Sequence, residues 1–78
     1  MRIAVIPNPD KRNALAYTAQ ICQLLNENGA QPVMLDSLRA ETEEMHSEYQ
    51  SDYDSLMKYT DVALTIGGDG TIIHAAKY

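Results

Sequence analysis

The chain has 78 residues and a formal net charge of −5, and it contains neither Trp nor Phe. A chain of this length forms at most one small domain and buries only ~60% of the surface that its unfolded state exposes. The acidic balance and the lack of a basic cluster argue against nucleic acid and membrane surfaces as partners. The single cysteine, Cys22, rules out an internal disulfide framework, and no apolar run approaches membrane-spanning length, so we expect a cytoplasmic protein.

The first part of the chain predicts a strand, a helix and a second strand. The segment from Arg2 to Pro7 is apolar and rich in β-branched residues, which indicates a strand. The next segment places its inward-facing residues at the spacing of an amphipathic helix: Ala14, Thr18, Ile21 and Leu25. Gly29 marks the end of this helix as a left-handed C-cap residue, and residues 31–35 form the second strand. A strand–helix–strand order with short turns implies parallel pairing through a right-handed crossover.

The chain then becomes strongly acidic. Seven of its eleven Asp and Glu residues lie between residues 36 and 54, where Arg39 is the only base. We interpret this acidic excursion, about 36–54, as a solvent-facing loop or a broken helix, because no apolar period is sustained there. A short helix around 51–59 leads back to a third strand at 62–66. This order predicts an α/β fold, a three-layer unit with a parallel sheet.

The most informative segment is a glycine turn, residues 67–71, with the sequence GGDGT. It follows the third strand, and we expect a helix to begin at about Thr71. The lysine of a Walker loop is absent, and the glycine spacing differs from the dinucleotide fingerprint. What remains is a turn at the carboxyl end of a parallel strand, where ligands usually bind in open α/β sheets. Asp69 could accept a proton from an attacking hydroxyl, hold Mg²⁺ through water, or cap the helix.

The glycine turn and the residues after it, IIHAAK at 72–77, resemble the signature of NAD kinases. The wider superfamily with Gly-Gly-Asp-Gly includes diacylglycerol kinases, sphingosine kinases and 6-phosphofructokinases. Lipid kinases continue after the threonine with an Asn-Glu pair, and phosphofructokinases depart at the glycine after the aspartate. The resemblance implies that residues 1–78 form the three-layer, Rossmann-like N-terminal α/β nucleotide-binding domain of an NAD kinase. This piece is incomplete, because the family's C-terminal all-β domain is absent from it.

The resemblance also implies a reaction. The γ-phosphoryl group of ATP would be transferred, with Mg²⁺ present, to the 2′-hydroxyl of the adenosine ribose of NAD, giving NADP. Asp69 would be the catalytic proton acceptor, and together with Gly70 it would line the NAD site. His74, one helical turn further on, would face the dinucleotide. The implied partners are therefore small nucleotides, NAD and ATP.

The nucleotide-binding set that the resemblance implies lies within the turn and just after it: Gly67, Gly68, Asp69, Gly70, Thr71 and His74. Gly67 and Gly68 would let the backbone approach the donor phosphates, and Thr71 would support the turn. No residue of this chain is assigned as a metal ligand. Because the family places most NAD contacts in its all-β domain, we expect little or no turnover from this fragment alone. We expect the full-length form to be a homo-oligomer.

The same glycine turn is compatible with two other functions. One is another GGDGT-type kinase, acting on a lipid or a sugar. The other is a non-catalytic nucleotide-binding module, in which Asp69 is only a helix cap. Phosphorylation assays with NAD and with a lipid distinguish the two kinases. The non-catalytic module is distinguished by phosphorylation that does not change when the Asp69 carboxylate is removed.

Four further residues have a structural and a functional interpretation. His46 lies in sequence beside several glutamates, but a solvated acidic face is favoured over a metal site. Cys22 lies on the inward stripe of the first helix and is interpreted as core rather than nucleophile. Asn8 and Lys11 follow the first strand, on the same edge of the sheet as the glycine turn. They could touch the nucleotide donor, and capping or solvent exposure explains them equally well.

Overall fold

A computed structural model describes residues 1–8, 13–67 and 73–76 of the chain, the last four by their backbone. The strands are β1 (Arg2–Pro7), β2 (Gln31–Leu35), β3 (Glu48–Gln50), β4 (Val62–Ile66) and β5 (Ile73–Ala76), and the longer helices are α1 (Ala14–Glu27) and α3 (Tyr53–Tyr59). Between β2 and β3 lie the short helix α2 (Arg39–Thr42) and the 3-10 helices Asp36–Leu38 and Glu43–Met45. Within the described ranges, no helix combines the length and the apolar character needed to cross a membrane.

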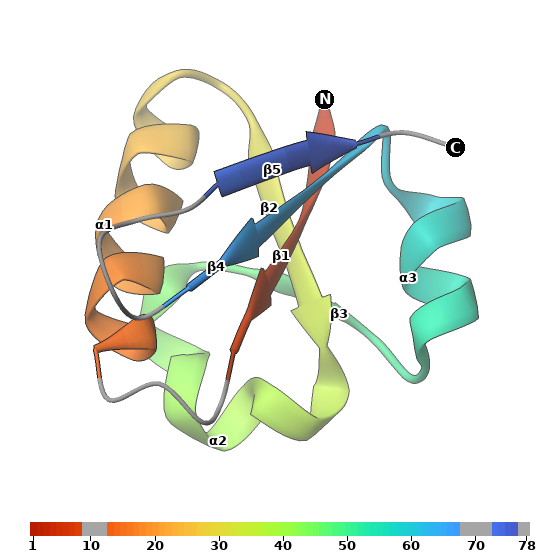
Figure 1. The fold of residues 1–78 in the computed structure, drawn as a ribbon, viewed down its shortest axis with the longest axis horizontal. Coiled ribbons are helices and arrows are strands. Elements are labelled where there is room, and N and C mark those ends of the chain that lie inside the picture. The colour runs from red at the N-terminus through yellow and green to blue at the C-terminus, as the bar shows by residue number, and fades with distance from the viewer. Residues whose placement is uncertain (9–12, 68–72, 77–78) are drawn as a thin grey trace.

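The strands form one five-stranded sheet in the order β3-β2-β1-β4-β5. The first four in this order run parallel, and β5 pairs antiparallel with β4. Figure 1 shows α1 on one side of the sheet and α3 on the other. These three layers confirm the predicted α/β fold. The strands β1, β2 and β4 occupy the segments in which strands were predicted.

Two hydrophobic clusters hold the helices to the sheet, one on each face. Successive residues of a strand point to opposite faces, so the neighbours Ala4 and Val5 belong to different clusters. On the face of α1 the buried cluster consists of Val5, Cys22, Met34 and Ile66. On the face of α3 it consists of Ala4, Val33, Leu56 and Ala63. Leu56 is the only buried residue of α3, so this helix is fixed to the sheet mainly through one side chain.

The ends of the helices follow from local chemistry. Gly29 comes directly after the C-cap residue of α1 and has a φ of 77°, which confirms the predicted left-handed glycine. Helix α3 lies inside the predicted segment 51–59 and begins after Asp52, whose Oδ1 accepts a hydrogen bond of 2.8 Å from the Ser55 backbone N–H. This bond lowers the pKa of Asp52 below its usual value, because it stabilises the charged carboxylate.

The prediction of a helix beginning at about Thr71 is wrong for residues 73–76, which the structure describes. Thr71 lies outside the described residues, but Ile73–Ala76 form strand β5. In its register with β4, His74 is opposite Thr65 and Ala76 is opposite Ala63. The physical reason is the free edge of β4, whose unpaired N–H and C=O groups gain partners when a neighbouring segment adds as a strand. A β-branched residue such as Ile73 also favours a strand.

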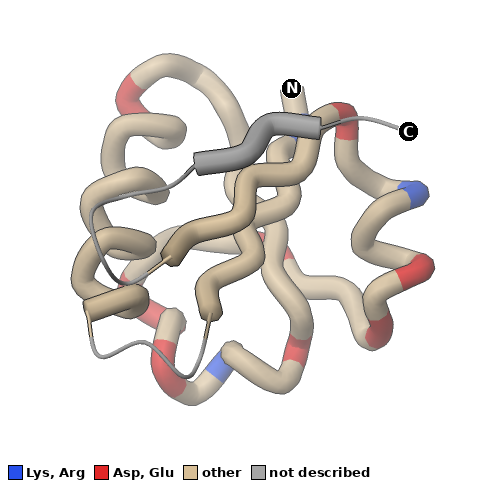
Figure 2. The backbone as a smooth tube through the Cα atoms, viewed as in Figure 1, with Lys and Arg blue, Asp and Glu red and all other residues tan. Residues whose placement is uncertain are grey.

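The acidic excursion contains a strand that the sequence does not predict. After two 3-10 helices and α2, the chain enters β3, which pairs with β2 through Tyr49 opposite Met34. The Tyr49 hydroxyl lies 2.6 Å from the Thr42 hydroxyl, and its ring lies 4.3 Å below the Arg39 guanidinium. Figure 2 shows the acidic positions gathered mainly along the chain between β2 and β4. The excursion is therefore packed against the sheet through Tyr49 while its carboxylates remain on the outside.

A polar cluster joins the strands at the amino end of the sheet. The Arg2 backbone N–H donates to Asp61 Oδ2 at 2.9 Å, and the Asp61 N–H donates to the Arg2 carbonyl at 2.8 Å. The Arg2 guanidinium lies 4.5 Å from the centre of the Tyr59 ring and 3.5 Å from Glu48 Oε1, which also accepts from the Tyr59 hydroxyl at 2.9 Å. This cluster connects β1, β3 and α3 at the amino end of the sheet, opposite the carboxyl ends of β1 and β4.

Candidate functional site

The strand order defines where an open α/β sheet binds its ligand. From β1 the chain proceeds through α1 to β2 and then to β3, whereas β4 is added on the other side of β1. The direction of the chain across the sheet therefore reverses between β1 and β4. In open α/β sheets such a reversal opens a crevice outside the carboxyl ends of the two strands, and ligands bind there. The strand order alone therefore places a ligand site at the carboxyl ends of β1 and β4, without reference to the glycine motif.

The carboxyl ends of β1 and β4 are held side by side. Pro7 is the register partner of Ile66. One residue further on, the Asn8 backbone N–H donates to the Ile66 carbonyl at 3.0 Å. Asn8 and Gly67, the two residues that directly follow these strands, therefore lie together at the crevice. Asn8 is exposed and Gly67 is half-buried.

Gly67 leaves open space at this position. A Cβ atom added there would meet no atom within 4 Å, and the φ of Gly67 lies outside the left-handed region. Neither backbone conformation nor packing against the described residues therefore requires glycine. The remaining physical reason for a glycine is unobstructed access to its backbone, which suits close approach of a ligand such as a phosphate group.

The structure covers part of the predicted nucleotide-binding set. Gly67 lies at the crevice, and His74 lies on β5 rather than on a helix, opposite Thr65. The predicted position of His74, one helical turn after the turn, is therefore wrong, while its predicted contact with a nucleotide stays a prediction. The remaining four predicted residues lie outside the described residues: Gly68, Asp69, Gly70 and Thr71.

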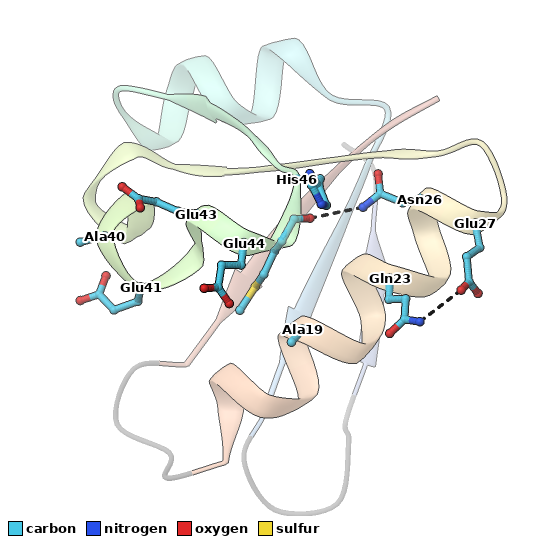
Figure 3. Close-up of a pocket in the computed structure, with 10 residues that line it drawn as sticks. Ala19, Gln23, Asn26, Glu27, Ala40, Glu41, Glu43, Glu44 and His46 are labelled. Carbon is cyan, nitrogen blue, oxygen red and sulfur yellow. Dashed lines mark hydrogen bonds between the residues drawn. The ribbon is translucent and has the colours of Figure 1, made fainter.

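A separate groove of about 700 Å³ lies between α1 and the acidic excursion. Figure 3 shows side chains of α1, such as Gln23 and Asn26, on one side of it and the segment from Ala40 to His46 on the other. The Asn26 amide donates to the Met45 carbonyl at 3.3 Å across the groove. The His46 carbonyl accepts from Gln31, the first residue of β2, which places this end of the groove at the amino ends of the strands. The groove is thus distinct from the crevice beside Gly67.

The groove has an acidic lining, which includes Glu27, Glu41, Glu43 and Glu44. His46 also lines it and has a left-handed backbone with a φ of 54°. Across the part of the chain that the structure describes, no three His, Cys, Asp or Glu side chains are grouped as they would be around a metal ion. The groove was not predicted from the sequence, because two segments far apart in the chain form it together.

Cys22 belongs to the core. Its side chain is fully buried in the cluster between α1 and the sheet, as predicted. Burial raises the pKa of the Cys22 thiol to about 11, because the thiolate would lose its hydration there. Since the thiolate is the nucleophilic form, this environment makes the thiol inert.

We therefore expect Cys22 in the folded chain to resist modification by a thiol reagent at pH 8. In urea it should react at the rate of a free thiol, because unfolding restores both access and an ordinary pKa. The measurement is the rate of thiol modification against urea concentration, compared with the unfolding curve from circular dichroism. Fast modification before unfolding would contradict the buried position.

The fold defines the class of this protein: an α/β domain in which Gly67 directly follows β4 at the topological switch point of the sheet. Comparison with known proteins narrows this class. The chain is 36% identical over its 78 residues to an NAD kinase of Methanosphaera stadtmanae. It is 29% identical over 77 residues to an NAD kinase of Acetivibrio thermocellus. Both matches extend over essentially the whole chain, so they confirm the predicted resemblance. They support the interpretation of this chain as a segment from the NAD kinase family.

The chain spans 27% and 26% of the lengths of these two relatives. No protein-family model matches the chain. No solved structure matches it either. Both relatives are named NAD kinases.

Proposed function

We propose that this chain is the part of an NAD kinase that contains its catalytic base. In the longer protein, the γ-phosphoryl group of ATP is transferred to the 2′-hydroxyl of the adenosine ribose of NAD. One observation carries the proposal: the GGDGT turn directly follows β4 at the switch point of the sheet, in a chain similar to NAD kinases along its whole length. The topology and the motif thus indicate the same edge of the sheet.

The division of roles follows from the chemistry of phosphoryl transfer. The transition state is loose, so catalysis depends mainly on positioning and on stabilising charge, and a carboxylate with an ordinary pKa of ~4 is an adequate base. Asp69 accepts the proton of the 2′-hydroxyl, and the backbone beside Gly67 approaches the phosphates. Mg²⁺, when bound with ATP, would neutralise part of the phosphate charge, and no residue of this chain is assigned to hold it.

A phosphorylation assay of the longer protein tests this function. With ATP and Mg²⁺, we expect NADP to form from NAD, and no phosphorylated product from diacylglycerol. The chain of 78 residues alone should give little or no NADP. Product from the lipid and none from NAD would contradict the proposal and favour a lipid kinase with the same turn. If neither NADP nor a phosphorylated lipid forms, a non-catalytic module is favoured.

The substitution Gly67→Ala is expected to affect nucleotide binding while leaving the stability of the fold nearly unchanged. Because an added Cβ meets no atom within 4 Å, we expect the free energy of unfolding to change by less than about 1 kcal/mol. Nucleotide binding should weaken severalfold, because the methyl group occupies the space through which a phosphate approaches. Urea unfolding and equilibrium dialysis with ATP measure the two effects. Unchanged nucleotide affinity would show that the phosphates do not approach Gly67.

A further inference from the structure

Helix α3 covers its face of the sheet unevenly. On the three central strands β2, β1 and β4, a first row of neighbouring side chains is buried in one cluster with Leu56: Val33, Ala4 and Ala63. A second row lies on the same face, two residues nearer the carboxyl ends of these strands, and is only half-buried: Leu35, Ile6 and Thr65. We call this second row the carboxyl row. It is the part of the face that α3 leaves partly open.

The opposite face of the sheet is closed at the same end. Ile66, the last residue of β4, is 1% exposed and packs in the cluster beneath α1. Pro7, its register partner on β1, is also buried. A ligand that lies over Gly67 and extends onto a face of the sheet therefore meets the carboxyl row, on the side of α3.

The carboxyl row combines two apolar side chains, Ile6 and Leu35, with one hydroxyl. In the part of the chain that the structure describes, no hydrogen bond engages the Thr65 hydroxyl, and no buried polar side-chain atom lacks a partner. The Thr65 hydroxyl is therefore open to solvent, and it can both donate and accept a hydrogen bond. An apolar surface with one polar group suits a nucleoside, whose flat base packs on aliphatic side chains while a ribose or base atom bonds to the hydroxyl.

The distance along β4 fits a nucleotide. Thr65 lies two residues before Gly67, a span of roughly 7 Å in an extended strand. A ribose separates a base from its phosphate by a similar length. We propose that the carboxyl row binds the adenosine part of a nucleotide whose phosphate lies over Gly67, with the Thr65 hydroxyl bonded to that adenosine.

ATP and NAD both contain adenosine, and the experiment separates these two sources. The inference rests on the proposed function for the identity of the nucleotide. It adds a site for the uncharged part of the nucleotide, which the predicted glycine-turn contacts with phosphate do not provide.

Nuclear magnetic resonance of the longer protein, labelled with ¹³C at Ile, Leu and Thr methyl groups, tests the contact directly. ATP, NAD, nicotinamide mononucleotide and sodium tripolyphosphate are titrated separately. We expect the methyl signals of Ile6 and Thr65 to shift with ATP or with NAD, because an aromatic base shifts the signals of methyl groups beneath its ring. Whichever of these two shifts them at the lower concentration supplies the adenosine. Equal shifts with tripolyphosphate, shifts with nicotinamide mononucleotide alone, or no shifts at all would overturn the inference.

Substitution of Thr65 tests the hydroxyl. Thr65→Val keeps the β-branched shape and removes the hydroxyl, so we expect the affinity for the adenosine-bearing probe to fall roughly fivefold, as for loss of one neutral hydrogen bond. Thr65→Ser should restore this affinity, and the affinity for tripolyphosphate should stay unchanged in both variants. Equilibrium dialysis measures both quantities.

Thr60→Val is the matched control. It makes the same change at the other end of β4, where the Thr60 hydroxyl donates to the Leu56 carbonyl at 2.8 Å. It should leave nucleotide affinity unchanged, and urea unfolding of each variant identifies a folding defect. Full affinity in Thr65→Val, or an equal loss in Thr60→Val, would contradict a bond from the Thr65 hydroxyl to the nucleotide.

The readouts separate this inference from the proposed function. If the longer protein binds ATP on the carboxyl row but forms no NADP, the proposed function is refuted and the adenosine site stands. Conversely, NADP formation with unshifted Ile6 and Thr65 methyl signals would refute only the adenosine site.

Discussion

Replacing Asp69 by Asn is expected to reduce NAD phosphorylation by the longer protein by about 10²–10⁴-fold, the usual contribution of a positioned general base. The amide has nearly the shape of the carboxylate but cannot accept the proton of the 2′-hydroxyl. The effect should therefore appear in kcat, with little change in the KM for NAD. The measurement is the initial rate of NADP formation at saturating ATP and Mg²⁺.

The matched control is Asp54→Asn, the same change at a side chain that is about 80% exposed on α3 and pairs with Lys58. Its rate should equal that of the unmodified protein. If Asp69→Asn retains full activity, Asp69 is not the catalytic base, and the non-catalytic interpretation of the turn is favoured. Circular dichroism of both variants confirms that any difference in rate does not come from unfolding.

Leu56→Ala should have the largest effect on stability. Leu56 is fully buried and is the only buried residue of α3. Truncating a buried leucine costs about 2–5 kcal/mol, through lost burial and the cavity that remains. A domain of this size has a free energy of unfolding of only about 4–12 kcal/mol, at roughly 0.05–0.15 kcal/mol per residue. We therefore expect Leu56→Ala to remove much of the stability, seen as a large fall in the urea midpoint.

Leu24→Ala is the control for this change, since Leu24 is 58% exposed on α1. It should alter the free energy of unfolding by no more than about 0.5 kcal/mol. Leu56→Met keeps the volume and should cost less than about 1.5 kcal/mol. Equal effects of the two alanine substitutions would mean that α3 is not held to the sheet through Leu56.

The elements that could be predicted from sequence are those whose own pattern specifies them. The helix α1 has inward residues at helical spacing and a left-handed Gly29 at its end, and β1, β2 and β4 are apolar runs between turn residues. The strand β3 has no such pattern, because Tyr49 is its only inward residue. This segment is recognised as a strand only through its pairing with β2. The strand β5 likewise depends on the free edge of β4, which no local pattern reveals.

The candidate site divides in the same way. The glycine turn was found from sequence, because the GGDGT motif and the strand before it are contiguous. The position of Asn8 beside Gly67 depends on β4 adding next to β1, on the side away from β2. Strand order is set by how the layers cover both faces of the sheet, and the local sequence of β1 or β4 does not encode it. The structure therefore brings two separate residues together where the sequence indicated one segment.

The central position of β1 has a consequence for how the crevice is made. β1 is the first strand of the chain, yet its pairing with β4, as in Ile3 opposite Val62, closes a loop of most of the chain. Such long-range pairing forms slowly, because the entropy of closing the loop is lost before the contact is gained. During synthesis the β1–β2 pair can form early, whereas the crevice exists only after β4 has docked. A nucleotide bound there would stabilise the β1–β4 pair, which closes this long loop.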